Sequence, residues 1–448
     1  MGKINLSFPN TSAQWIWLPP EESSDVMLAR KDFVLEQKPG KATCAITASA
    51  QYKLYINEQF LSIGPARCAS HHQSYAVFDI SDLLETGKNI IAVEVHHQRG
   101  NVSYQHTSRG GILCQIEFPK NAGHSPVISN DSWKVAPDPT WENDSPRMSY
   151  AHMEVVDRRD LRQAIGDWKT VNFDDTLWSN ATVLQREQGW PLPQEDERPG
   201  HLVPPWTAFV QRDIPDLKYA KISCDHYLQR GSLYNAQPVL DDDWLNLPVI
   251  KEIEIGDDSV QSTFDLPTEI ASSSDDSTPY MLYDLNEVHN AHTYLEIGGP
   301  AGTVIDILSA PFLLDGKLLT PLLGSHYVDR IVLSGNRDRW EAHYWKPIRY
   351  LAVIVRGGGR ENKGGVVIHE VGVRKNEYPF ELKSSFATPD FPELEKLFHA
   401  SDKTIRTATT DVPKRPITRV WAITICLAIQ LCNGVISFRW HKSNWPMD

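Results

Sequence analysis

The alternation of apolar and polar residues along most of this chain limits its fold more than any single motif does. The runs MLARKDFVL (27–35) and ATCAITASAQYKLYINEQFL (42–61) alternate with a period of two residues. Because neighbouring side chains of a strand point to opposite faces of a sheet, this period predicts half-buried antiparallel strands. The dipeptide Asn57-Glu58 separates two such stretches and predicts a turn in a meander.

The same period continues beyond these two runs. It predicts strands at residues 75–80, 90–95 and 110–118, so that residues 12–120 form an all-β sandwich with Trp15 and Trp17 in its first strand. Residues 120–215 are rich in Pro, Asp and Trp and are expected to form loops and short strands wrapped on that sandwich. The first domain is therefore predicted to cover residues 12–215.

A second β-sandwich is predicted over residues 216–380. Alternation returns from Tyr280 to Val355, with a turn predicted at Asp315-Gly316. The stretch SSSDDSTP (272–279) is rich in Ser, Asp and Pro, which is typical of a linker or an exposed loop.

The pattern changes from strand to helix at about Phe386. Pro392 stands where a helix favours proline, in its first turn. The apolar residues of this stretch recur at helical spacings: Phe391, Leu394, Leu397, Phe398 and Ile405. The expected fold class is mainly β, with tandem antiparallel sandwiches of lectin-like or jelly-roll type followed by a short helical segment.

Composition excludes several classes of function. The formal net charge is −13 and no basic stripe is present, which argues against a nucleic-acid partner.

The 6 cysteines are scattered without a CxxC pair, so buried thiols are expected rather than a zinc site or a disulfide framework. The N-terminal residues do not resemble a secretory signal, so a cytoplasmic location is the default expectation. The 14 Trp and 15 Tyr residues make stacking platforms for sugars plausible.

The loop after Val95, HHQRGNVSYQH (96–106), offers candidate sugar contacts. His97 and Tyr104 are the candidate binding residues, with Tyr75 and His96 as further candidates, although the alternative is that all four are ordinary polar or packing residues. No metal or other cofactor is predicted, because adjacent histidines such as His96 and His97 point to opposite faces of a strand. The charge run Asp157-Arg158-Arg159 is expected to form solvated or interdomain ion pairs.

Several stretches resemble the bacterial α-L-rhamnosidases. ARKDFVL (29–35), ASAQYKLYINEQFLSIGP (48–65) and YAVFDISDLLETGKNIIAVEV (75–95) resemble the lectin-like N-terminal sandwich of that family, and EVVDRRD and DWKTVNFDDTLW follow in order. The second sandwich is matched by YDLNEVHNAHTYLEIGGPAGTVIDILSA, YVDRIVLSG and WKPIRYLAVIV. Asn286 and His292 stand where the family usually has glycine, and both changes are expected to affect turns.

The resemblance implies an inverting glycoside hydrolase that removes terminal α-L-rhamnose from glycans, with a catalytic (α/α)6 barrel after its sandwiches. TTDVPKRPITRVW (409–421) resembles the family's DCPxRE motif, which would place Asp411 against the rhamnose hydroxyls and Arg415 beside the substrate. Pro416 stands where the family has its glutamic acid, and proline cannot donate a proton.

We therefore expect a rhamnosidase-like protein represented by its β-sandwich half and inactive by itself, with a rhamnose-containing glycan as partner. Two alternatives are a non-catalytic carbohydrate-binding module and a working enzyme that uses other residues.

The apolar stretch VWAITICLAIQLCNGVISF (420–438) has three interpretations. Its length suits a membrane span, but Gln430 and Asn433 near its middle argue against one. A slipped reading frame is favoured, because suitable codons read one base earlier give GDYNLFGNTTMQWS, an amphipathic string. A genuinely divergent end is the third. Residues 385–448 are accordingly expected to be the start of the helical barrel, with an apolar tail that promotes self-association.

Overall fold

The computed structural model contains two compact units, residues 1–376 and 377–448. The structure describes residues 4–5, 8–9, 12–49, 51–68, 72–97, 110–120, 123–143, 145–148, 154–184, 208–224, 226–234, 245, 248–254, 262–263, 266–270, 277–322, 324–357, 365–381 and 385–410.

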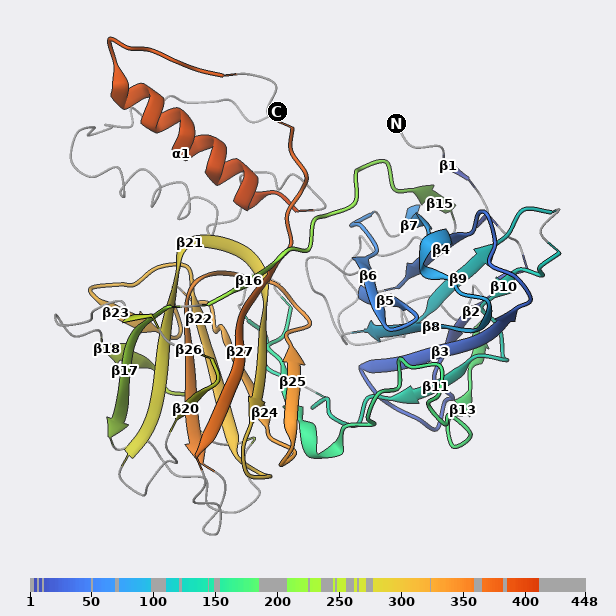
Figure 1. The fold of residues 1–448 in the computed structure, drawn as a ribbon, viewed down its shortest axis with the longest axis horizontal. Coiled ribbons are helices and arrows are strands. Elements are labelled where there is room, and N and C mark those ends of the chain that lie inside the picture. Colours follow the sequence, from blue (N-terminus) through green and yellow to red (C-terminus); the bar gives the residue numbers. More distant parts are fainter. Residues whose placement is uncertain are drawn as a thin grey trace, which may run out of the picture. The chain divides into compact units, whose positions relative to one another are not determined.

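The first unit begins with a sandwich of two sheets, called here the first sandwich (Figure 1). The larger sheet has the order β1-β15-β7-β4-β9-β2-β14, with β10 beside β9, and the smaller has the order β13-β11-β3-β8-β5-β6. The strands of the larger sheet are β1 (Ile4–Asn5), β2 (Trp15–Trp17), β4 (Thr43–Ala48), β7 (His72–Asp79), β9 (Ile112–Glu117), β10 (Val127–Ile128), β14 (Thr182–Leu184) and β15 (Ala208–Gln211). Those of the smaller sheet are β3 (Val26–Leu35), β5 (Gln51–Ile56), β6 (Gln59–Gly64), β8 (Gly87–His96), β11 (Lys134–Pro137) and β13 (Ser179–Asn180).

The two-residue period places the apolar residues of these strands between the two sheets. Tyr52, Leu54 and Ile56 alternate along β5 and are fully buried in the same core as Ile46 of β4 and Val93 of β8. The predicted turn between β5 and β6 is confirmed, because Asn57 and Glu58 both adopt positive φ, at 47° and 68°. Such a two-residue turn matches the twist of the strands that it joins.

The second sandwich is built from one strongly bent sheet, in which β21 is the central strand. The first half of β21 pairs with β26 and its second half pairs with β25 and β27, so one strand serves both layers. Its strands are β16 (Lys221–Ser223), β17 (His226–Tyr234), β19 (Ser262–Thr263), β20 (Thr268–Ile270), β21 (Ser277–Gly298), β22 (Val304–Ala310), β24 (Val328–Val332), β25 (Arg337–Glu341), β26 (Lys346–Gly357) and β27 (Val366–Lys375). A separate ribbon pairs β18 (Glu252–Glu254) with β23 (Lys317–Leu319).

Two details of the second sandwich differ from the sequence-based expectation. Residues 277–279, predicted as linker, begin strand β21, because Ser277 pairs with Tyr234 of β17. His292 lies inside β21 rather than in a turn, and its fully buried ring contacts the carbonyl oxygen of Ala342 at 3.1 Å. Asn286 does occupy a turn-like irregularity of β21, with φ of 64°.

The segment after the first sandwich joins the second one. Strand β12 (Arg158–Asp160) pairs in parallel with β24, so the charge run at 157–159 lies on the edge of the second sheet. A buried apolar cluster closes the same region, formed by Val26, Trp141, Met148, Val155, Val156, Tyr327 and Tyr344. The two sandwiches therefore share packed contacts within the first unit.

The described part of the second unit contains the predicted helix, α1 (Pro392–Ala408). Pro392 occupies its first turn, and the apolar side chains of Phe391, Leu394 and Ile405 are exposed. The expected fold class, tandem β-sandwiches followed by a short helical segment, is confirmed. Across the residues that the structure describes, no helix combines the length and apolar character of a membrane span. The apolar stretch 420–438 lies outside the described residues.

Candidate functional site

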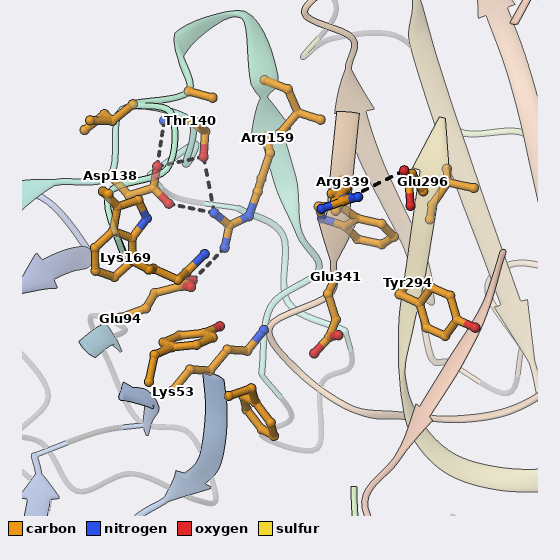
Figure 2. A pocket seen from close by; sticks show the side chains of 18 of the residues that line it. Lys53, Glu94, Asp138, Thr140, Arg159, Lys169, Tyr294, Glu296, Arg339 and Glu341 are labelled. Atoms are coloured by element: carbon orange, nitrogen blue, oxygen red, sulfur yellow. Dashed lines mark hydrogen bonds and ion pairs between the residues drawn. The ribbon is translucent and has the colours of Figure 1, made fainter. Parts of the chain in front are cut away.

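A cavity of about 540 Å³ opens between the two sandwiches (Figure 2). Its walls come from β5, β6 and β8 of the first sandwich, from the 159–169 segment, and from β21, β25 and β27 of the second sandwich. The aromatic residues that line it are Tyr55, Phe60, Trp168, Tyr294 and Trp340. The volume and the mixture of aromatic and polar walls are typical of a small-molecule site.

Arg159 of β12 organises the polar side of this cavity. Its guanidinium donates to Asp138 Oδ2 at 2.6 Å, to Glu94 Oε1 at 3.0 Å and to Asp157 Oδ2 at 3.2 Å. Burial by itself would lower the pKa of Arg159, but the three carboxylates outweigh it and raise that pKa. Arg159 is therefore a permanent cation that holds residues of both sandwiches together.

Glu94 of β8 stays ionised in this environment. Burial would raise its pKa, but the charge of Arg159 and the hydrogen bonds of His343 and His96 hold the pKa of Glu94 well below its usual range. Its Oε1 also lies 2.9 Å from His96 Nε2. An ionised carboxylate accepts hydrogen bonds and cannot donate one, so Glu94 is an acceptor for hydroxyl groups.

Two lysines point into the cavity beside Glu94, as Figure 2 shows. Lys53 of β5 donates to the carbonyl oxygen of Ala342 at 3.2 Å. Lys169 lies over the rings of Tyr55 and Trp168, with Nζ 4.9 and 5.2 Å from their centroids. Burial lowers the pKa of Lys169. These ammonium groups supply donors to the same space that the aromatic rings line.

The opposite wall carries three carboxylates of the second sandwich, each in an ion pair. Glu341 accepts from Arg374 Nε at 3.1 and 2.9 Å through its two oxygens. Glu296 pairs with Arg339 at 3.4 Å and also with Arg337. The third pair joins Lys221 Nζ to Glu370 Oε2 at 3.6 Å.

Glu94, His96 and His343 form the one cluster among the described residues with ligand atoms close enough for a metal ion, all within 4.8 Å of one another. The fit to a metal is poor, because Arg159 Nη2 already binds Glu94 and lies 3.5 Å from His96 Nε2. A metal ion there would meet the guanidinium charge. Burial lowers the pKa of both His96 and His343, so the stacked rings are neutral.

None of the described residues that were chosen from the sequence lines this cavity. Tyr75 packs in the first core against Phe8 and Phe209, and His96 is buried behind Glu94. His97 is half-buried, with its ring in edge contact with Trp17 at 6.0 Å. Tyr104, Asp411 and Arg415 lie outside the described residues.

Sequence reasoning missed Lys53, Glu94 and Lys169 as site residues. A charged residue inside an apolar strand could have identified two of them in the sequence. Lys53 interrupts the run QYKLYI, and Glu94 interrupts the run IIAVEVH. A buried charge of this kind needs a partner or a function. The run Asp157-Arg158-Arg159 was predicted to form ion pairs, and Arg159 does so between the two sandwiches.

Comparisons with known proteins agree with this architecture. Residues 37–199 match the profile of the α-L-rhamnosidase N-terminal domain. An α-L-rhamnosidase of Formosa agariphila is 29% identical over 203 residues, which cover 40% of this chain and 21% of that protein.

Solved structures with the same fold include a GH78 family rhamnosidase of Bacillus sp. GL1, with a TM-score of 0.72 and 18% identity over 90% of this chain and 58% of that one. An α-L-rhamnosidase of Aspergillus terreus has a TM-score of 0.57 and 19% identity over 91% of this chain and 41% of that one. The match to the curated relative thus covers about a fifth of that protein's length.

Tandem sandwiches around an aromatic and charged cavity define a mainly β protein that shares the fold of solved rhamnosidase structures. More narrowly, the chain is similar to the α-L-rhamnosidases, and residues 37–199 match the N-terminal domain of that family.

Proposed function

We propose that this rhamnosidase-like chain binds rhamnose-containing glycans through the cavity between its sandwiches and does not hydrolyse them by itself. The observation that carries the proposal is that each of the described carboxylates that line the cavity pairs with an arginine or a lysine. Such a lining recognises hydroxyl groups and lacks an available acid.

Glycoside hydrolysis by inversion requires a carboxylic acid that is protonated near neutral pH and a second carboxylate that activates water. Glu94 lines the polar side of the cavity, and its low pKa makes it unsuited to donate a proton. Asp329 has a pKa raised to about 6, but its side chain is fully buried against Lys346 and does not line the cavity. The lining therefore suits binding.

The aromatic residues of the cavity fit a sugar ligand. Tyr55 and Phe60 are half-buried, and their rings contact each other edge to face at 5.8 Å. The apolar face of a sugar ring stacks on such rings, while Glu94 accepts and Lys53 donates hydrogen bonds to its hydroxyls.

Hydrolysis of terminal α-L-rhamnose with inversion is the second candidate function. It rests on the relatives named α-L-rhamnosidase and on the resemblance of residues 409–421 to the family's motif. Asp411 and Arg415 would contact the substrate in that case, and both lie outside the described residues.

Two measurements on the full chain separate these functions. Calorimetric titration with methyl α-L-rhamnoside should give saturable binding that is weakened at least tenfold by Phe60→Ala. Tyr234→Ala is the matched control, because Tyr234 is 74% exposed and does not line the cavity. An aryl α-L-rhamnoside should release no aryl alcohol above the buffer rate. Turnover would favour the second function, and the lack of any binding would contradict the first.

A further inference from the structure

We propose that the cavity binds a saccharide that carries an anionic group, and that Lys53 and Lys169 hold that group. This inference rests on the proposed saccharide binding and specifies the class of ligand. The shared chemistry is an oxyanion on the sugar, either the carboxylate of a uronic acid or a sulfate ester.

Two cationic residues that line the cavity are not part of its ion pairs. Each of the five lining carboxylates has a cationic partner within the lining: Glu94 and Asp138 share Arg159, Glu296 contacts Arg339, Glu341 contacts Arg374, and Glu370 contacts Lys221. Six cationic residues line the same cavity. Of these, Lys53 and Lys169 are the two without a carboxylate partner among the described residues.

The contacts of both ammonium groups leave donors unused. Within the part of the chain that the structure describes, Lys53 Nζ has one hydrogen-bond acceptor, the carbonyl oxygen of Ala342 at 3.2 Å. Lys169 Nζ lies against the rings of Tyr55 and Trp168, which attract the charge but accept no conventional hydrogen bond. An ammonium has three N–H donors, so the two groups retain most of their capacity for a ligand.

The charge of the cavity lining is opposite to that of the whole chain. Six cationic and five acidic residues line the cavity, whereas the chain carries a formal net charge of −13. Burial lowers the pKa of Lys169 although the charges of Glu94 and Asp167 raise it, so the nearby carboxylates compensate the buried ammonium only in part. A bound oxyanion would supply the missing counterion.

The remaining acidic groups do not oppose such a ligand strongly. Arg159 Nη2 donates to Glu94 Oε1 at 3.0 Å and so offsets the charge of that carboxylate. Asp157 accepts from Arg159 Nε and from the main-chain amide of His343. Glu94 therefore remains as an acceptor for a neighbouring sugar hydroxyl. Figure 2 shows Glu94, Lys53 and Lys169 on one side of the cavity, and in this proposal one sugar contacts all three.

The test uses the full chain and three probes measured by calorimetry at low ionic strength. The probes are an α-L-rhamnosyl-glucuronate disaccharide, the methyl ester of the same disaccharide, and a sulfated methyl α-L-rhamnoside. We expect the free acid to bind at least tenfold more tightly than its methyl ester. Sulfated rhamnoside that binds more tightly than the free acid would identify a sulfate ester as the preferred source of the anion.

Lys169→Gln should abolish the preference for the acid, whereas Lys169→Arg should keep it because the charge remains. Lys88→Gln is a matched control on the exposed end of β8 and should leave the preference unchanged. Equal affinity for acid and ester in the wild-type protein, together with equal affinity for sulfated and unsulfated methyl α-L-rhamnoside, would overturn this inference and leave the proposed function intact. No binding of any saccharide would overturn the proposed function itself.

Discussion

Lys346 Nζ donates to Asp329 Oδ2 at 2.7 Å, and neither side chain is exposed to solvent. Asp329 Oδ1 also accepts from the main-chain amide of Asp157 at 2.9 Å, next to the β12–β24 pairing that links the two sandwiches. Removal of one partner of a buried ion pair leaves an uncompensated charge. This pair is therefore a sensitive point for the stability of the first unit.

Lys346→Met is expected to lower the free energy of unfolding by about 3 to 5 kcal/mol at pH 8, because the Asp329 carboxylate loses its cation. Burial, together with the charge of Asp157, already raises the pKa of Asp329 to about 6 although Lys346 lowers it. Below that pKa the folded protein holds the proton, so the cost of the substitution should shrink at pH 5. Urea unfolding at both pH values measures this.

The double variant Lys346→Met with Asp329→Asn is the control for the previous prediction. An asparagine can still accept from the amide of Asp157 and carries no charge. The double variant should regain part of the unfolding free energy that the single variant loses at pH 8. Because neither substituted residue titrates, this site should add nothing to the difference in unfolding free energy between pH 5 and pH 8. An equal cost of the single variant at both pH values would contradict the pKa argument.

Three buried histidines are expected to make the protein less stable as the pH falls from 7 to 5. Burial lowers the pKa of His96, His292 and His343 below the ordinary histidine value. Below pH ~6.5 these histidines bind protons in the unfolded chain but stay neutral in the folded protein. Each of them therefore lowers the free energy of unfolding by up to about 1.4 kcal/mol for every unit that the pH falls. Urea unfolding at half-unit steps of pH gives the slope.

His292→Asn should reduce that slope, and His326→Asn should not, because the side chain of His326 is exposed. The comparison is made on the change of unfolding free energy between pH 7 and 5 rather than on its absolute value. A slope that is unaffected by His292→Asn would mean that this ring is charged in the folded protein.

The positions of the strands could be predicted because the period of two residues is local. Tyr52, Leu54 and Ile56 reveal the buried face of β5 within six residues of sequence. Strand β12 could not be predicted in this way, since its three residues Arg-Arg-Asp contain no apolar alternation and pair with a strand about 170 residues away. Pairing over such a separation is set by tertiary contacts rather than by propensity.

The site was harder to predict than the fold. Glu94, Arg159 and His343 come from three distant segments, and no spacing in the sequence links them. The search for adjacent polar residues led instead to the loop after Val95, where His96 is buried and His97 packs on Trp17. The charges at Lys53 and Glu94 inside apolar strands were the informative signal, because a buried charge requires compensation.

We expect Asn286→Ala to lower the free energy of unfolding more than Asn286→Gly does. Its φ of 64° lies in the left-handed region, where glycine is unstrained and asparagine is better tolerated than other residues. Its main-chain amide donates to Asp284 Oδ1 at 2.8 Å, so the turn itself survives either change. Asn286→Ala is expected to cost about 1 kcal/mol of unfolding free energy, and Asn286→Gly less than about 0.5 kcal/mol.

Thermal and urea unfolding of both variants measure this difference, with Asn290→Ala as a control at a strand position of the same β21. If Asn286→Ala is no less stable than Asn286→Gly, the positive φ is not maintained in solution.

The thiols of Cys44 and Cys114 are expected to be unreactive in the folded protein. Their sulfur atoms lie 3.9 Å apart between β4 and β9, and both side chains are fully buried. Burial and the contact with Cys44 raise the pKa of Cys114 well above its usual range, so little thiolate forms. Because the thiolate is the nucleophile, iodoacetamide at neutral pH should alkylate half-buried Cys68 before the three buried cysteines that the structure describes. Peptide mass spectrometry after timed labelling locates each modified cysteine.

Addition of urea should expose Cys44 and Cys114 together, because they share one core. Rapid labelling of either cysteine without urea would contradict the prediction and show that the first sandwich opens locally.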